Sequence, residues 1–140
     1  MLLPADALAT GLPTGGAHVV TSAFGLKTLA PAAYPALAQE AACLLRPGGR
    51  LVLLEVALAW GGGLRRLLPV YLAILLPVVR GLCPAAAVHA ALAGYLRRGS
   101  NLAALRRALR QAGFGQLRQQ RLWPGCAVLL TAERTALPPQ

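Results

Sequence analysis

The sequence predicts an α/β domain built on a mixed sheet, with parallel strands, a C-terminal antiparallel hairpin and a helical insertion. An apolar-periodic segment ends at Pro47-Gly48-Gly49, and a continuous apolar run, 51–54, follows at once within the segment 50–56. This pattern indicates a helix, a tight turn and a buried strand that ends at Glu55 and Val56. Because a strand that is apolar on both faces needs cover on both faces, we expect a parallel or mixed sheet between helices.

The elements before this strand form a crossover unit. Residues 2–12 are irregular and end in a Pro-Thr-Gly-Gly turn, 13–16. Residues 17–23 are rich in β-branched side chains between turn residues, which predicts a strand. Pro31 suits the first turn of a helix, and apolar residues at helical spacing continue to Leu45. We therefore expect a helix that connects two parallel strands.

The pattern changes after the central strand. A Gly-Gly-Gly joint, 61–63, precedes two apolar helical segments at about 64–79 and 85–97. Since they are inserted at the carboxyl end of a strand, we predict that residues 64–98 form a helical lid over that end of the sheet.

The last part of the chain predicts a helix and a hairpin. Ser100-Asn101 caps a helix that runs to Gln111 and stops at Gly113. Two strands, about 116–122 and 127–132, are joined by Trp-Pro-Gly and fit an antiparallel hairpin at a sheet edge. The domain is expected to span residues 1–135, with a frayed tail at 136–140.

The chain is strongly basic and rich in apolar residues. Its 14 Lys+Arg against 4 Asp+Glu give a net charge of +10, and 56% of its 140 residues are hydrophobic. The positive charge could serve binding to nucleic acid or to an anionic membrane surface, or it could result from a proteome biased toward Ala, Arg, Gly, Leu and Pro. We favour the third explanation, because the chain lacks the interleaved aromatic residues on which single strands stack. Nucleic-acid binding is therefore not expected.

The sequence predicts a cytoplasmic protein without a metal site. Three widely spaced cysteines without neighbouring histidines do not form a zinc pattern and are interpreted as reduced thiols. Asp6 interrupts the first apolar run, so no signal peptide is expected. The longest apolar run, 67–79, is shorter than the ~20 residues of a membrane span. A peripheral membrane contact stays open, because arginines flank the apolar lid segments: Arg65, Arg66, Arg80, Arg97 and Arg98.

Several short motifs in a fixed order carry a family resemblance. The chain resembles the C-terminal half of a class I S-adenosylmethionine-dependent methyltransferase, and more closely the ubiquinone/menaquinone-biosynthesis C-methyltransferase family. The similarity runs from about Pro4 to Arg134. Its anchors are Asp6-Ala7, Phe24-Gly25-Leu26-Lys27, Leu45-Arg46-Pro47-Gly48-Gly49-Arg50-Leu51, Leu53-Leu54-Glu55, Leu76-Pro77, Tyr95-Leu96 and Ala112-Gly113-Phe114. The resemblance implies a partial Rossmann-like sheet and S-adenosylmethionine as cofactor.

The resemblance also implies which residues contact the cofactor. Asp6 and Ala7 match the pair that lines the adenine pocket, where a carboxylate can accept from the adenine amino group. Ala23 and Phe24 match positions at the end of the strand that touches the cofactor. From the residues alone, an ordinary loop cap is the preferred interpretation of Asp6.

The residues implied on the acceptor side lie in the lid and near the strand ends. Lys27 stands where the family usually has Arg, and Tyr71 and Tyr95 complete the set of acceptor contacts. Glu55 and His89 are the catalytic candidates. We expect Glu55 to face the cleft, because burial without a partner would be costly. His89 could deprotonate a ring hydroxyl, or could be a lid histidine near solvent.

One half of the family's fold has no counterpart in the sequence. The glycine-rich loop after the first strand and the acidic residue that holds the ribose are both missing. We therefore expect an unpaired edge on strand 17–23 and weak or absent cofactor binding by this chain alone. A short isoform, a fragment, a truncated gene model or a chain completed by a partner would explain this. The alternative function is a non-catalytic remnant that binds a protein, such as a second copy or a paralogue, or a membrane surface.

Overall fold

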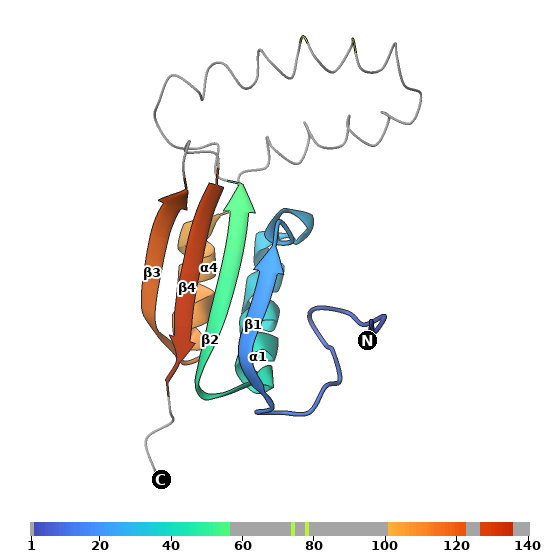
Figure 1. The fold of residues 1–140 in the computed structure, drawn as a ribbon, viewed down its shortest axis with the longest axis vertical. Coiled ribbons are helices and arrows are strands. Elements are labelled where there is room, and N and C mark those ends of the chain that lie inside the picture. Colours follow the sequence, from blue (N-terminus) through green and yellow to red (C-terminus); the bar gives the residue numbers. More distant parts are fainter. Residues whose placement is uncertain (1, 57–73, 75–77, 79–100, 123–126, 136–140) are drawn as a thin grey trace.

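The protein is described by a computed structural model that covers residues 2–56, 74, 78, 101–122 and 127–135. A four-stranded sheet with the order β1-β2-β4-β3 forms one layer, and two helices form the other (Figure 1). The strands are β1 (Ala17–Ala23), β2 (Leu45–Val56), β3 (Phe114–Leu122) and β4 (Ala127–Arg134), and the helices are α1 (Tyr34–Leu44) and α4 (Leu102–Gln111).

The strand pairing confirms the predicted mixed sheet. β1 and β2 are parallel, with Val20 opposite Leu51. β2 and β4 are antiparallel, with Leu53 opposite Leu130, and β4 pairs with β3 in the antiparallel sense. The predicted hairpin is therefore present, with β3 at a sheet edge. Its Trp-Pro-Gly connection lies outside the described residues.

Helix α1 connects the two parallel strands as predicted. The 3₁₀ turns Leu26–Thr28 and Pro31–Ala33 precede it, so the α-helical part begins later than Pro31. Leu45 leaves the helix in an extended conformation, and Gly48 has a φ of 75°. The structure counts this turn as part of β2 because Leu45 already pairs with Ala17.

Helix α4 begins and ends at the predicted signals. The Asn101 side chain accepts a hydrogen bond from the Ala104 amide at 3.0 Å, which satisfies one of the free donors of the first turn. Gly113 ends the helix with a φ of 85°, a value that a residue with a Cβ adopts only with strain. β3 follows directly at Phe114, earlier than the predicted Gln116.

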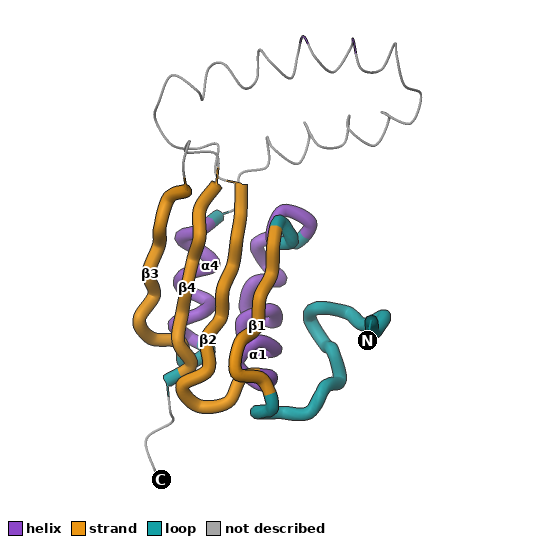
Figure 2. The backbone as a smooth tube through the Cα atoms, in the orientation of Figure 1, coloured by secondary structure: helices purple, strands orange, loops and turns teal. Residues whose placement is uncertain are grey.

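The two faces of the sheet have different environments. We call the face that packs on α1 and α4 the closed face, and the opposite face the open face (Figure 2). Closed-face side chains of β2 and β4 are buried: Leu51, Leu53, Glu55, Val128, Leu130 and Ala132. Open-face side chains are half-buried or exposed: Val19, Thr21, Ala23, Arg50, Val52, Leu54, Arg118, Gln120, Leu129, Thr131 and Glu133.

The expected cover on both faces is found on only one of them within the described part of the chain. Of the predicted lid, 64–98, only Ile74 and Val78 are described, and both are helical and exposed. The rest of the lid and the tail 136–140 lie outside the described residues. Among the helices that are described, none has the length and apolar character needed to cross a membrane.

The N-terminal segment lies beside β1 and is attached to α1 (Figure 1). The Thr10 amide and hydroxyl both donate to Glu40 Oε1, at 2.9 and 2.5 Å. These bonds, the side-chain one first, lower the pKa of Glu40. Across the described strands, β1 pairs only with β2, so its other edge carries no described strand, in agreement with the expected unpaired edge.

Candidate functional site

The turn Phe24–Lys27 is the most constrained feature at the carboxyl ends of the parallel strands. It leaves β1 where β2 also ends, which is the edge at which open α/β sheets bind ligands. The Phe24 amide donates to the Leu54 carbonyl at 2.8 Å and extends the parallel ladder by one bond. The start of this turn is therefore fixed to the neighbouring strand.

The backbone of the turn has an unusual shape. Phe24 has a φ of 59°, which is uncommon for a residue with a bulky side chain, and the residue is 52% exposed. Gly25 approaches the sheet so closely that a Cβ there would lie 2.9 Å from Ser22 Oγ. Such strain persists only when the surroundings hold it, and strained backbone clusters at functional sites.

Glu55 holds the turn from the adjacent strand. Its Oε1 accepts a hydrogen bond from the Leu26 amide at 2.9 Å, and Leu26 itself is buried. Only 1% of Glu55 is exposed, and it belongs to the closed face, in line with Leu51 and Leu53. The carboxyl group is thus buried on the helix side and does not face an open cleft, contrary to the sequence-based expectation. Side chains of a strand alternate between its two faces, so the positions of Leu51, Leu53 and Glu55 at every second residue already indicated that Glu55 shares the buried face.

Glu55 interacts electrostatically with two ionisable groups, Lys27 and Tyr34. Burial raises the pKa of Glu55, while the Leu26 hydrogen bond and then the Lys27 charge oppose that shift. Burial lowers the pKa of the half-buried Lys27, and Glu55 opposes that change. The pKa of Tyr34 is raised mainly by burial and in smaller part by Glu55. No ion pair joins Glu55 to Lys27 among the described side chains, so their attraction acts over a longer distance.

Asp6 and Ala7 lie apart from the turn, in the N-terminal segment. Asp6 Oδ1 accepts from the Leu8 amide at 2.9 Å, which is the local loop cap favoured by the residues alone. Both residues are exposed. Ala7 lines a mainly apolar pocket of about 200 Å³ together with Thr10, Val20, Leu37 and Glu40. The structure does not bring Asp6 or Ala7 into contact with Phe24.

The predicted lid residues Tyr71, His89 and Tyr95 lie outside the described residues. So do the arginines whose position beside the apolar lid segments left a peripheral membrane contact open. Ala23, Phe24 and Lys27 are the predicted site residues that the structure brings together with Glu55. Within the described ranges, no three His, Cys, Asp or Glu side chains form a cluster that could hold a metal ion.

Two further residues of this site were not predicted. The Leu26 amide is the hydrogen-bond donor to Glu55, and Tyr34 is a neighbour of Glu55 that is 2% exposed. A tyrosine among the apolar positions of a buried helix was the available signal, since buried Tyr hydroxyls usually have a polar partner. A hydrogen bond with the backbone of Asn101 supplies that partner.

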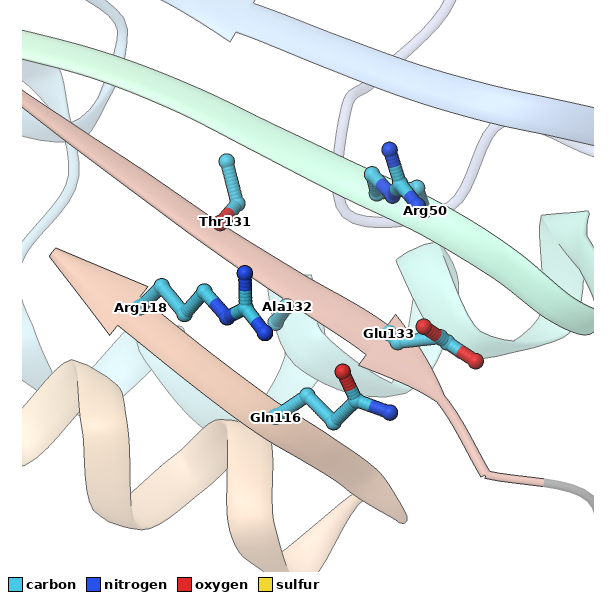
Figure 3. A pocket seen from close by; sticks show the side chains of 6 residues that line it. All are labelled: Arg50, Gln116, Arg118, Thr131, Ala132 and Glu133. Atoms are coloured by element: carbon cyan, nitrogen blue, oxygen red, sulfur yellow. The ribbon is translucent and has the colours of Figure 1, made fainter.

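A second pocket lies on the open face, away from the turn (Figure 3). It has a volume of about 210 Å³, and its side chains come from β2, β3 and β4. Figure 3 shows the residues that line it: Arg50, Gln116, Arg118, Thr131 and Glu133, which belong to the open face, and Ala132 on β4 between two of them. None of the site residues predicted from the sequence lines it.

Solved structures share this fold. A possible exported protein from Bordetella parapertussis matches with a TM-score of 0.61 and 18% identity, over 94% of this chain and 43% of that one. Human N-acetylserotonin methyltransferase in complex with SAM matches at 0.59 and 16% identity, over 94% and 32%. A SAM-dependent methyltransferase from Thermotoga maritima, a possible histamine N-methyltransferase, matches at 0.59 and 15%, over 96% and 64%. This chain therefore spans less than two thirds of each of these proteins.

No curated protein matches the sequence. The family model of the ubiE/COQ5 methyltransferase family matches residues 2–134. That range includes the turn Phe24–Lys27, Glu55 and every other element described above. The match agrees with the methyltransferase fold found among the solved structures. The chain belongs to the ubiE/COQ5 methyltransferase family.

Proposed function

We propose that this chain supplies the adenine side and the acceptor side of an S-adenosylmethionine-dependent methyltransferase that acts on a small hydrophobic acceptor of the quinone-precursor type. The observation that carries the proposal is the turn Phe24–Lys27, fixed by Leu54 and Glu55 at the carboxyl ends of two parallel strands. Membership of the family supports the reaction class, and its name suggests the class of acceptor.

Two exposed side chains support the proposed adenine side. The half-exposed Phe24 ring offers a flat apolar surface, and Asp6 offers an exposed carboxylate that can accept from an amino group. Within the described part of the chain, no glycine-rich loop follows the carboxyl end of a strand. The groups that hold the methionine and ribose parts are therefore expected to come from other residues, and binding by this chain alone is expected to be weak or absent.

Catalysis would rest mainly on orientation. When bound, the cofactor supplies an electrophilic methyl group on a sulfonium. The turn would fix the position of Phe24 against it, and the Lys27 ammonium would orient an oxygen atom of the acceptor. Since Lys27 keeps a positive charge but lacks the planar fork of arginine, it makes a less directional contact than the usual residue of the family.

A titration with S-adenosylhomocysteine tests this proposal. We expect NMR amide shifts at millimolar ligand to be confined to 24–27 and 6–7, and Phe24→Ala to reduce them. Val19→Ala is the matched control, because Val19 is as exposed as Phe24 and lies on β1 away from the strand's carboxyl end, where the turn begins. Shifts centred on the pocket of Figure 3, or unaltered shifts in Phe24→Ala, would overturn the proposed site. Micromolar affinity would show that this chain needs no further groups.

A second candidate function is binding of a protein partner, such as another copy or a paralogue. One edge of β1 carries no strand among the described residues, and Val19 on this strand is 53% exposed; both observations favour this candidate. Light scattering after size exclusion distinguishes the candidates. A partner at this edge would be supported if Val19→Lys abolished association and Ala103→Lys, on the outer side of α4, preserved it. A monomer at all concentrations would rule out self-association.

A further inference from the structure

Glu55 is a buried carboxyl group with half of its hydrogen-bonding capacity unused. One oxygen accepts from the Leu26 amide, while Oε2 has no hydrogen-bond partner among the described residues. An ionised carboxylate in such a place would lose the hydration of Oε2, and the Leu26 bond and the Lys27 charge offset that loss only in part. A neutral carboxylic acid loses much less, because it carries no charge.

The surroundings of Glu55 offer little compensation for a negative charge. Leu51 and Leu53 precede it on the same face, and Val128 lies opposite it on β4. Lys27, from the turn after β1, supplies the positive charge that acts on it, without an ion pair. Tyr34, at the start of α1, is the other ionisable neighbour. The net effect of these groups leaves the pKa of Glu55 raised, with burial as the main cause.

The same carboxyl group controls the shape of the turn. The Phe24 amide is tied to Leu54, and the Leu26 amide is tied to Glu55, so both ends of the Phe24–Leu26 segment are fixed to β2. Phe24 is thereby held at a φ of 59° with its ring directed out of the core. Loss of the Glu55 bond would release one end of the segment and leave the Leu26 amide buried without a partner.

We propose that Glu55 is a positioning residue that acts as a neutral carboxylic acid: by accepting the Leu26 amide it holds the Phe24–Lys27 turn in the conformation that receives ligand. The functional part of this inference rests on the proposed function. Glu55 is not required to exchange a proton with the acceptor. Ionisation of Glu55 at alkaline pH would loosen the turn, since the charge is better satisfied by water than by this site.

Two substitutions separate the neutral acid from a carboxylate. Glu55→Gln keeps an oxygen that can accept the Leu26 amide and removes the ability to ionise, so it reproduces the proposed state. Glu55→Leu fills a similar volume and removes the acceptor. Glu133→Gln is the matched control, because it removes a negative charge from a half-buried site on the open face, in the pocket that lies away from the turn.

The expected results concern the Leu26 amide and its dependence on pH. With the full chain, Glu55→Gln should keep the hydrogen-exchange protection of this amide within about twofold, and Glu55→Leu should reduce it roughly tenfold, the loss of about one neutral hydrogen bond. In the wild type, protection corrected for intrinsic exchange should fall as pH rises from about 5 to 9. In Glu55→Gln it should stay constant, and Glu133→Gln should follow the wild type.

The free energy of unfolding of the wild type should also decrease as pH rises, relative to that of Glu55→Gln. A carboxyl group whose pKa is raised on folding binds more protons in the folded state, so its contribution to stability declines as pH rises through the folded pKa. The free energy of unfolding of Glu55→Gln should therefore increase relative to the wild type between pH 5 and pH 8. A difference that does not vary with pH would overturn the neutral acid, and equal loss of protection in Glu55→Gln and Glu55→Leu would show that the charge itself holds the turn.

Ligand binding tests the positioning role. The shift that S-adenosylhomocysteine causes at the Phe24 amide should weaken at alkaline pH in the wild type and remain constant in Glu55→Gln. A purely structural carboxyl group would not produce this difference, and equal pH profiles would remove the positioning role. If the ligand shifts no amide in any variant, the proposed function and the positioning role both fail, and the exchange data still decide whether Glu55 is neutral.

Discussion

The closed and open faces of the sheet are built from alternate residues of the same strands, yet their environments differ. On β2, Leu53 is 2% exposed and packs under the helices, whereas its neighbour Leu54 points to the open face and is only half-buried. Small residues of the helices, such as Ala38 and Ala108, allow close packing on the closed face. The difference indicates that the closed face supplies most of the stability.

The open face keeps apolar residues that no described element covers. Leu54 lies opposite Leu129 and Val52 lies two residues before Leu54 on the same face, whereas Val19 lies opposite the charged Arg50. Solved structures of the same fold are longer than this chain, which matches 43% of one of them and 32% of another. The closed face is thus part of a packed core, whereas the open face has exposed apolar residues suited to further contacts.

Leucine-to-alanine substitutions at adjacent positions should give the largest difference between the faces. Leu53→Ala leaves a cavity between the sheet and α4 and should lower the free energy of unfolding by about 2–5 kcal/mol. Leu54→Ala removes the same atoms from a half-buried site and should cost less than about 1 kcal/mol. Urea unfolding of both variants, followed by circular dichroism, measures the two costs.

Equal costs would break the contrast between the faces. If Leu54→Ala destabilised the protein as much as Leu53→Ala, the open face would be covered in solution. The unfolding midpoint of the wild type would then rise with protein concentration if the cover were a second copy. A midpoint independent of concentration, with unequal costs, would confirm that the open face is uncovered in the isolated chain.

Local signals in the sequence predicted the elements of the closed face well. The Pro-Gly-Gly turn, the Asn101 cap and Gly113 each impose a conformation through nearby atoms alone, and the structure confirms all three. The direction of Glu55 was also encoded, by its alternation with Leu51 and Leu53, although the cost of burying a carboxylate argued for the opposite placement. A raised pKa was the physical option that this argument left out.

Features that depend on distant residues could not be predicted from local patterns. The φ of 59° at Phe24 arises because bonds from Leu54 and Glu55, about thirty positions away, fix both ends of the turn. The apolar residues of β2 predicted that other elements cover both faces of the sheet. Such a pattern shows that a face is apolar, but it does not show which segment or which chain covers that face. The role of Tyr34 likewise depends on a distant residue, because its hydrogen bond comes from the backbone of Asn101, the cap residue before α4.

The cover of the closed face should depend to a smaller extent on the cap of α4. Asn101→Ala removes the acceptor for the Ala104 amide and should lower the free energy of unfolding by about 1 kcal/mol. Asn101→Asp should retain most of it, because a carboxylate accepts the same bond and interacts favourably with the helix N-terminus. Arg107→Ala, at an exposed site in the same helix, serves as the control and should change stability by less than about 0.5 kcal/mol.

Hydrogen exchange shows whether this loss stays within the closed face. Fraying of the first turn of α4 should speed exchange near Leu102 and Leu105, while the amides of β1 keep their protection. If Asn101→Ala leaves stability unchanged, packing of Leu105 and Leu109 alone holds the helix on the sheet. If it also loosens the Phe24–Lys27 turn, the contact between the Asn101 backbone and Tyr34 couples the cover of the closed face to the site beside Glu55.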